Sequence, residues 1–118
     1  MAALVNGRTD AVVATSVEVA DTRRTRRKGL LGRASLDPAS AMLITPCFSV
    51  HTAFMRFPID VAFVDREGRA VRLVRALPPW RMAGAFGAHA VIELAAGRLD
   101  ACDVQVGDRL FLTPAVTR

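Results

Sequence analysis

The stretch His51-Thr-Ala-Phe-Met-Arg-Phe-Pro-Ile-Asp-Val-Ala-Phe-Val-Asp65, followed by Arg66-Glu-Gly68 and Arg69-Ala-Val-Arg-Leu-Val74, decides most of the fold. Apolar extended runs flank a short turn that contains glycine, which is the pattern of an antiparallel hairpin. Pro58 should bend the first run, so we expect one extended segment over residues 51–57 and a second over 59–65. Residues 69–76 should then return antiparallel to the second.

Alternation of apolar and polar residues predicts further strands in the rest of the chain. We expect them at residues 11–20, 42–45, 88–95 and 109–113. Asp21 or Thr22 can cap a short helix that extends through Gly32, and residues 97–104 suit a turn or a short second helix. Residues 78–87, rich in Pro and Gly, should form an irregular loop. The order predicts an α+β fold with a mainly antiparallel, barrel-like sheet.

The same alternation predicts which strand residues are buried. Val61 and Phe63 share one face of their strand, as do Ile92 and Leu94 of a later strand. We expect these four side chains to pack in one core.

Length and composition suit one domain that spans residues 1–118. Hydrophobic residues make up 52% of the chain, which excludes a disordered protein. The net charge is +5, and fifteen of the sixteen basic residues are arginine. An arginine-rich composition of this kind is typical of GC-rich genomes, so the charge is weak evidence for a polyanionic partner.

The sequence favours a cytoplasmic protein. Its first residues lack the basic and apolar regions of a signal peptide, and no apolar run is long enough to span a bilayer, so no membrane partner is expected. The two cysteines, Cys47 and Cys102, do not require a disulfide in a domain that can build its own core.

An ordered set of short motifs carries a resemblance to a known family. They are Arg26-x-x-Gly29-Leu-Leu-Gly-Arg33, Ala41-Met-Leu-Ile44, Phe54-Met-Arg56, Pro58-Ile-Asp-Val-Ala-Phe63, Val91-Ile-Glu-Leu-Ala-Ala-Gly97 and Gly107-Asp108. Over about residues 11–113 the chain resembles the domain of unknown function 192 family, an uncharacterised bacterial and archaeal family. The resemblance implies a small, mainly β domain and no particular reaction. Many members carry Trp-Met-Lys-Asn-Thr where this chain has Phe54-Met-Arg-Phe57, so a role for that polar pair does not transfer.

Charged and aromatic residues in apolar surroundings form the first candidate site. Arg56 and Asp60 lie four residues apart in the apolar segment, and burying either charge alone is costly, so we expect them to pair. Glu93 should face a cavity or solvent, since its neighbours Ile92 and Leu94 should be core. Trp80 and Arg81 lie in a loop able to cover such a cavity. These residues suit a small anionic or planar ligand, although Arg56–Asp60 and Arg81–Glu93 salt bridges are an equal alternative.

Cys47 and His51 form a second candidate site, because a nearby imidazole can activate a thiolate for hydrolase or transferase chemistry. A buried thiol beside a histidine explains the same pair without catalysis. We expect no metal, because the two His and two Cys lack zinc-ligand spacing, and no other cofactor.

The segment Asp21 to Arg33 is rich in basic residues, and Arg26 and Arg33 could form a weak anion site. The alternatives are a solvated face or a nucleic-acid surface, and the absence of interleaved aromatic residues disfavours nucleic acid. We therefore expect non-catalytic binding of a small anionic or planar ligand, or of a protein partner. The Cys–His enzyme and nucleic-acid binding remain the alternatives, and the sequence gives no oligomeric state.

Overall fold

The computed structural model describes residues 2–114, which form nine strands and two short helices. In chain order these are β1 (Ala2–Asn6), β2 (Val12–Ala20), α1 (Arg23–Lys28), β3 (Ser40–Ile44), β4 (Ser49–His51), β5 (Ile59–Val64), β6 (Ala70–Leu77), β7 (Met82–Gly84), β8 (Ala90–Ala95), α2 (Arg98–Ala101) and β9 (Leu110–Pro114). No helix among these residues is long and apolar enough to cross a membrane.

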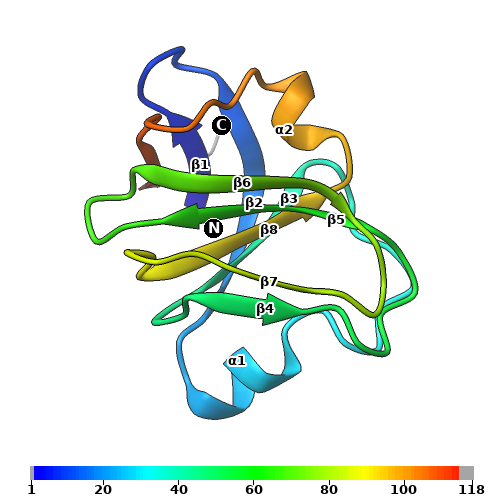
Figure 1. Cartoon of the computed structure of the whole chain (residues 1–118). Coiled ribbons are helices and arrows are strands. Elements are labelled where there is room, and N and C mark those ends of the chain that lie inside the picture. Colours follow the sequence, from blue (N-terminus) through cyan, green and yellow to red (C-terminus); the bar gives the residue numbers. More distant parts are fainter. Residues whose placement is uncertain (1, 115–118) are drawn as a thin grey trace.

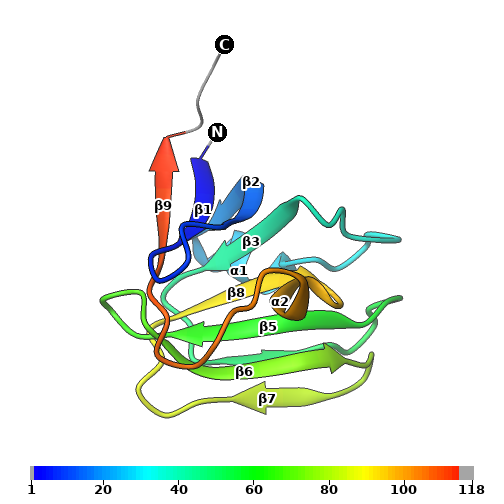
Figure 2. The same ribbon diagram turned by 90° about the horizontal axis from the view of Figure 1, so that it is seen from above.

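Seven strands form one sheet in the order β6-β5-β8-β3-β2-β1-β9, and β4 pairs with β7 in a separate ribbon (Figure 1). Neighbouring strands of the large sheet are antiparallel except β2 and β3, which are parallel. The sheet is therefore mixed rather than purely antiparallel. It curls strongly, so that β9 and β1 stand across the direction of β5 and β6 (Figure 2). The α+β fold with a barrel-like sheet is confirmed.

Main-chain hydrogen bonds join the two edges of the curled sheet beside β6 and β9. The amide of Leu110 donates to the carbonyl of Gly68, and the amide of Ala70 donates to the carbonyl of Asp108, each at 2.8 Å. Gly68 has φ +84°, and a Cβ atom there would lie 2.6 Å from the Leu110 carbonyl oxygen. A side chain would thus block the contact that closes the barrel at this end.

The central strands β5 and β8 are buried on both faces of the sheet, and each face has its own core. Leu4, Ala62, Ile92, Leu94 and Leu99 belong to the core inside the curl. The outer face, which carries Val61, Phe63 and Val91, packs under the segment that follows α1 and under the β4–β7 ribbon. The expectation of one core for Val61, Phe63, Ile92 and Leu94 was therefore wrong. All four are buried, but cross-strand register places Phe63 opposite Val91 and Ile92 opposite Ala62.

Two of the strands were not predicted from the sequence. β1 precedes the first expected strand, and β7 lies inside the segment expected to be an irregular loop. Residues 51–57 were expected to be extended, yet β4 ends at His51 and a turn follows. The remaining expected strands match β2, β3, β5, β6, β8 and β9 with small shifts at their ends, and the short second helix is α2.

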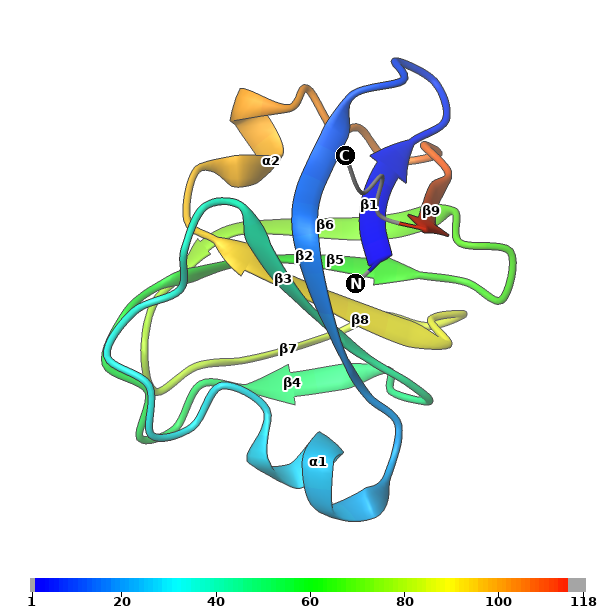
Figure 3. The ribbon, with the colours of Figure 1, turned by 180° about the vertical axis from the view of Figure 1, so that it is seen from behind.

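Helix α1 begins after Thr22, as the sequence suggested, but it ends at Lys28 rather than near Gly32. Thr22 and Thr25 form a reciprocal capping box, which satisfies amide groups at the helix start. None of its own residues is buried, so the following Leu30, which is 2% exposed, anchors this segment to the outer core. The two helices lie at opposite ends of the molecule (Figures 1 and 3).

Asp60 is fully buried but does not pair with Arg56, so the expected ion pair was wrong. One carboxylate oxygen of Asp60 accepts the amide of Ala76 at 2.8 Å, and the other accepts the amide of Leu99 at 2.9 Å. Arg56 is exposed, and its side chain makes no ion pair or hydrogen bond within residues 2–114. Because two main-chain donors compensate the buried charge, Asp60 needs no cation. It fastens the end of β6 and the start of α2 to β5.

We predict that Asp60→Ala lowers the free energy of unfolding by about 2–4 kcal/mol, since a buried donor left unsatisfied costs about 1–3 kcal/mol. Asp65→Ala is the matched control. The Asp65 carboxylate also accepts two main-chain amides, those of Glu67 and Arg69, each at 2.9 Å, but in an exposed turn where water can replace it. That change should cost about 1 kcal/mol or less. Urea denaturation measures both, and equal losses would contradict a special role for Asp60.

Candidate functional site

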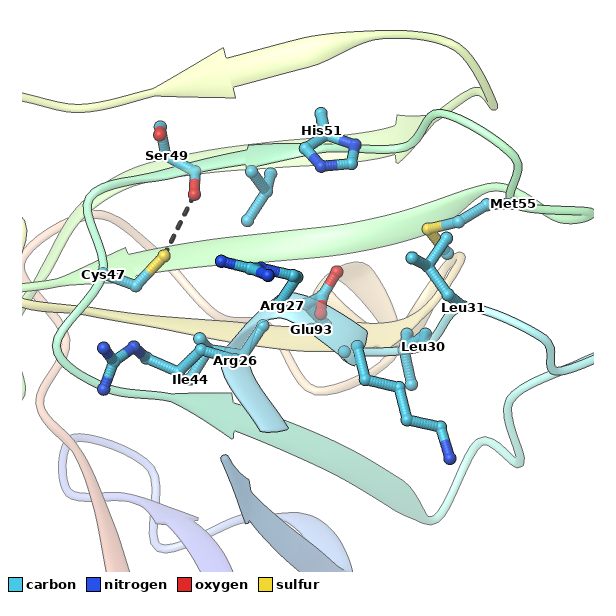
Figure 4. A pocket seen from close by; sticks show the side chains of 13 residues that line it. Arg26, Arg27, Leu30, Leu31, Ile44, Cys47, Ser49, His51, Met55 and Glu93 are labelled. Atoms are coloured by element: carbon cyan, nitrogen blue, oxygen red, sulfur yellow. Dashed lines mark hydrogen bonds between the residues drawn. The ribbon is translucent and has the colours of Figure 1, made fainter. Parts of the chain in front are cut away.

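A pocket of about 80 Å³ lies between α1 and the outer face of the sheet (Figure 4). We call it the Glu93 pocket. Its walls are mainly apolar and come from the segment after α1, from β3, from β4 and from the loop after β4: Leu30, Leu31, Ile44, Val50 and Met55. A pocket this small suits a small molecule or one end of a larger one.

Glu93 reaches this pocket from β8, in the middle of an otherwise apolar surface. Its cross-strand neighbours are Met42 on β3 and Val61 on β5, both in the outer core. The residue is only 4% exposed. Gly29, at the end of α1, lies above it, and a Cβ atom at Gly29 would stand 3.6 Å from a carboxylate oxygen of Glu93. Glu93 therefore places a carboxylate on a surface of the sheet that its cross-strand neighbours make apolar.

The carboxylate of Glu93 makes no hydrogen bond with any residue from 2 to 114. Within the same range, every side-chain nitrogen or oxygen that is sealed from solvent has a partner, so the oxygens of Glu93 must contact the space of the pocket. Burial raises the pKa of Glu93 to about 7, while the positive charge of Arg33 partly opposes this shift. Glu93 therefore changes charge near neutral pH.

Three consecutive cations of α1 line the pocket on its solvent side: Arg26, Arg27 and Lys28. Arg26 donates to the carbonyl of Asp21 at 3.0 Å. The side chains of Arg27 and Lys28 are exposed and make no hydrogen bond or ion pair among the described residues. They remain available to an anion.

Arg33, the other residue of the expected weak anion site, does not line the Glu93 pocket. Its guanidinium binds both carboxylate oxygens of Glu18, at 3.1 and 2.6 Å. This ion pair raises the pKa of Arg33 and lowers that of Glu18. Arg33 is thus engaged by an acidic residue, and the cations on the pocket are Arg26, Arg27 and Lys28.

Cys47 and His51 both line the Glu93 pocket, but they do not form a Cys–His pair. The Cys47 thiol donates to the carbonyl of Ser49 at 3.0 Å, and it makes no hydrogen bond to His51 (Figure 4). Cys47 lies in the turn before β4 and His51 ends that strand, so the spacing of four residues separates them along an extended chain. A thiol that donates its proton to a carbonyl is not prepared as a nucleophile.

Trp80 and Arg81 lie outside the Glu93 pocket. The ring of Trp80 packs edge to face on that of Phe54, with centroids 4.6 Å apart, and both residues are largely exposed. Arg81 donates to the carbonyl of Trp80 at 3.3 Å and makes no ion pair with Glu93. The buried Thr52 joins these loops, because its hydroxyl donates to the Pro78 carbonyl at 2.6 Å and accepts the Arg81 amide at 2.8 Å.

The structure therefore combines parts of three separate sequence hypotheses. It brings Glu93 together with Cys47, His51 and Arg26, and it leaves out the other five candidates: Arg33, Arg56, Asp60, Trp80 and Arg81. Among residues 2–114 no three His, Cys, Asp or Glu side chains are placed to hold a metal ion.

The sequence hypotheses included Arg27 and Lys28 only as members of the basic segment, the Arg23–Arg33 face, and did not connect them or the apolar walls with Glu93. A signal was present, because Leu30 and Leu31 follow a wholly polar helix and need an apolar surface to cover. That surface is the one interrupted by Glu93.

We predict that Glu93→Gln stabilises the protein at pH 8 and has little effect at pH 4. The pKa of Glu93 is raised from 4.5 to about 7 on folding, so its protonation supports the folded state below pH about 4.5. This support is lost as pH rises through about 7. The shift sets an upper limit of about 3 kcal/mol on the gain at pH 8, from about 1.4 kcal/mol per pKa unit.

Denaturation at the two pH values measures this gain, with the exposed Glu67→Gln as control. An equal effect of Glu93→Gln at pH 4 and pH 8 would contradict the raised pKa.

Comparisons with known proteins agree with this architecture. The family model of DUF192, described as uncharacterized ACR, matches residues 4–112. A UPF0127 protein of Thermococcus sibiricus is 31% identical over 112 residues, which cover 91% of this chain and 72% of that protein.

Two crystal structures share the fold, each with 22% sequence identity. A protein of unknown function from Novosphingobium aromaticivorans has a TM-score of 0.80, with 93% of this chain and 82% of that chain covered. A protein described as a putative transcription regulator, from Sinorhizobium meliloti, has a TM-score of 0.79, with 94% and 91% covered. With a family model that spans nearly its whole length, the chain belongs to the uncharacterised DUF192 family.

Proposed function

We propose that the protein binds a small organic anion in the Glu93 pocket and does not transform it. The observation that carries this proposal is the carboxyl group of Glu93, which is 4% exposed and lacks a hydrogen-bond partner among residues 2–114. Buried polar groups are normally hydrogen-bonded, so a ligand group is the natural partner of one that opens into a pocket.

The charges around the mouth favour an anion. Arg27 and Lys28 are exposed on the solvent side of the pocket and make no hydrogen bond or ion pair with described residues, and the charge of Lys28 also acts on Glu18. Charge-assisted hydrogen bonds from such groups to a carboxylate or phosphate are stronger than neutral ones. The apolar walls of the pocket suit an aliphatic or planar body.

Cys47 and His51 support binding rather than catalysis. The Cys47 thiol uses its proton to bond the Ser49 carbonyl, and no described base contacts its sulfur. Both residues can still contact a ligand, because both line the pocket.

Nucleic-acid binding is less well supported than small-molecule binding. The relative from Sinorhizobium meliloti is described as a putative transcription regulator, but at 22% identity that description concerns the other protein. The basic segment of residues 21–33 has no aromatic residue on which bases could stack.

Calorimetric titration with butanoate, pentanoate and hexanoate at pH 6 tests the proposal, since most Glu93 side chains are then protonated and do not repel an anion. We expect at least one of these acids to bind. The double variant Arg27→Gln/Lys28→Gln should weaken the tightest of them at least tenfold, which equals about 1.4 kcal/mol. Native mass spectrometry of protein purified from its own host should show a retained small molecule.

Arg23→Gln/Arg24→Gln is the matched control, because it removes the same charge from the same helix at residues that do not line the pocket. It should change affinity less than threefold at physiological salt. Equal losses of affinity in the two double variants would show that only the overall positive charge of the helix matters. That result would contradict a specific site at Arg27 and Lys28.

A further inference from the structure

The Glu93 pocket contains groups of opposite charge at its floor and at its mouth. Its floor, on the sheet, carries the acidic group of Glu93, and its mouth carries the cations Arg27 and Lys28. Leu30, Leu31 and Met55 add apolar walls to the same pocket. One anionic group of a ligand can contact the cations, which leaves Glu93 to contact a second polar group of the same ligand.

The described residues do not supply a cation for Glu93. Arg33 is near enough to influence its charge, but the guanidinium of Arg33 is bound by both oxygens of Glu18. Arg26 donates to the Asp21 carbonyl. Replacement of Glu93 by an apolar residue would complete the apolar face formed with Met42 and Val61. A carboxylate placed there without a partner is suited to a positively charged ligand group.

We infer that the ligand is zwitterionic: a protonated amine binds Glu93, an aliphatic segment lies along Leu30, Leu31 and Met55, and a carboxylate meets Arg27 and Lys28. This inference rests on the proposed function and adds the chemical class of the ligand. An amino acid whose amine and carboxylate stand at opposite ends of a short chain has this distribution of charge. The attraction of an ammonium group also lowers the pKa of Glu93, so binding favours its ionised form.

Other charged or titratable groups around Glu93 shape the test. Arg26, Arg27 and Lys28 face the pocket from α1, Cys47 from the turn before β4, and His51 from β4, while Arg33 acts from the loop after α1. Ligands are best compared at one pH, because the charge of Glu93 itself depends on pH. At pH 8 Glu93 is mostly ionised.

Titration at pH 8 should compare 4-aminobutanoate, 5-aminopentanoate and 6-aminohexanoate with the acids that lack the amine and with alkylamines that lack the carboxylate. We expect the best amino acid of the series to bind at least tenfold more tightly than its matched acid and its matched amine. Glu93→Gln should remove the advantage over the acid, and Arg27→Gln/Lys28→Gln should remove the advantage over the amine. Glu67→Gln, an exposed change in the turn before β6, should leave both ratios unaltered.

The outcomes separate this inference from the proposed function. If the simple acids already bind to the unmodified protein as tightly as the amino acids, and Glu93→Gln does not change this ratio, the inference of a zwitterionic ligand is wrong. The proposal of anion binding then stands. If neither class binds at pH 6 or pH 8, both proposals fail. Glu93→Gln removes a buried charge and should be more stable at pH 8, so a lost preference would not reflect unfolding.

Discussion

The need to cover both faces of the β5–β8 pair with one short chain governs the structure. All six residues of β5 and five of the six residues of β8 are buried. The curl of the sheet covers one face, and the segment after α1 covers the other together with the β4–β7 ribbon. A polar side chain on either strand must therefore be satisfied inside the protein or open into a pocket. Asp60 and Glu93 represent these two outcomes.

The two buried acids differ in what surrounds them. Asp60 accepts hydrogen bonds from two main-chain amides and joins β5 to the end of β6 and to α2. Glu93 has no such donor within residues 2–114, and burial raises its pKa to about 7. The contrast separates a carboxylate that holds the fold together from one that the fold leaves available. It also explains why the polar character of the pocket depends on a single side chain of the sheet.

Local patterns in the sequence predicted most of the fold. The turn at Gly68, the alternation in β2 and β6, and the cap at Thr22 are encoded by neighbouring residues and were recognised. The parallel pairing of β2 with β3 and the division into two cores were not, because they depend on contacts between distant segments. β7 is a three-residue strand, Met82–Gly84, whose pairing with β4 leaves almost no local signal.

The candidate site was only partly predictable for the same reason. Glu93 could be identified as an acid in an apolar strand, but its neighbours Arg27 and Lys28 come from a helix more than sixty residues earlier in the chain. The proximity of Arg56 and Asp60 in the sequence suggested an ion pair, but main-chain amides satisfy the carboxylate of Asp60.

The contact between Gly68 and Leu110 also affects how the protein meets other chains. Edge strands expose unpaired amides and carbonyls that can recruit a foreign strand and start aggregation. Here the ends of the two edge strands, β6 and β9, bond to each other's flanking residues. Less free backbone is left at that end for strand addition. A side chain at Gly68 would therefore weaken the fold and would also expose unpaired backbone groups at the sheet edge. Such an edge favours self-association of the protein.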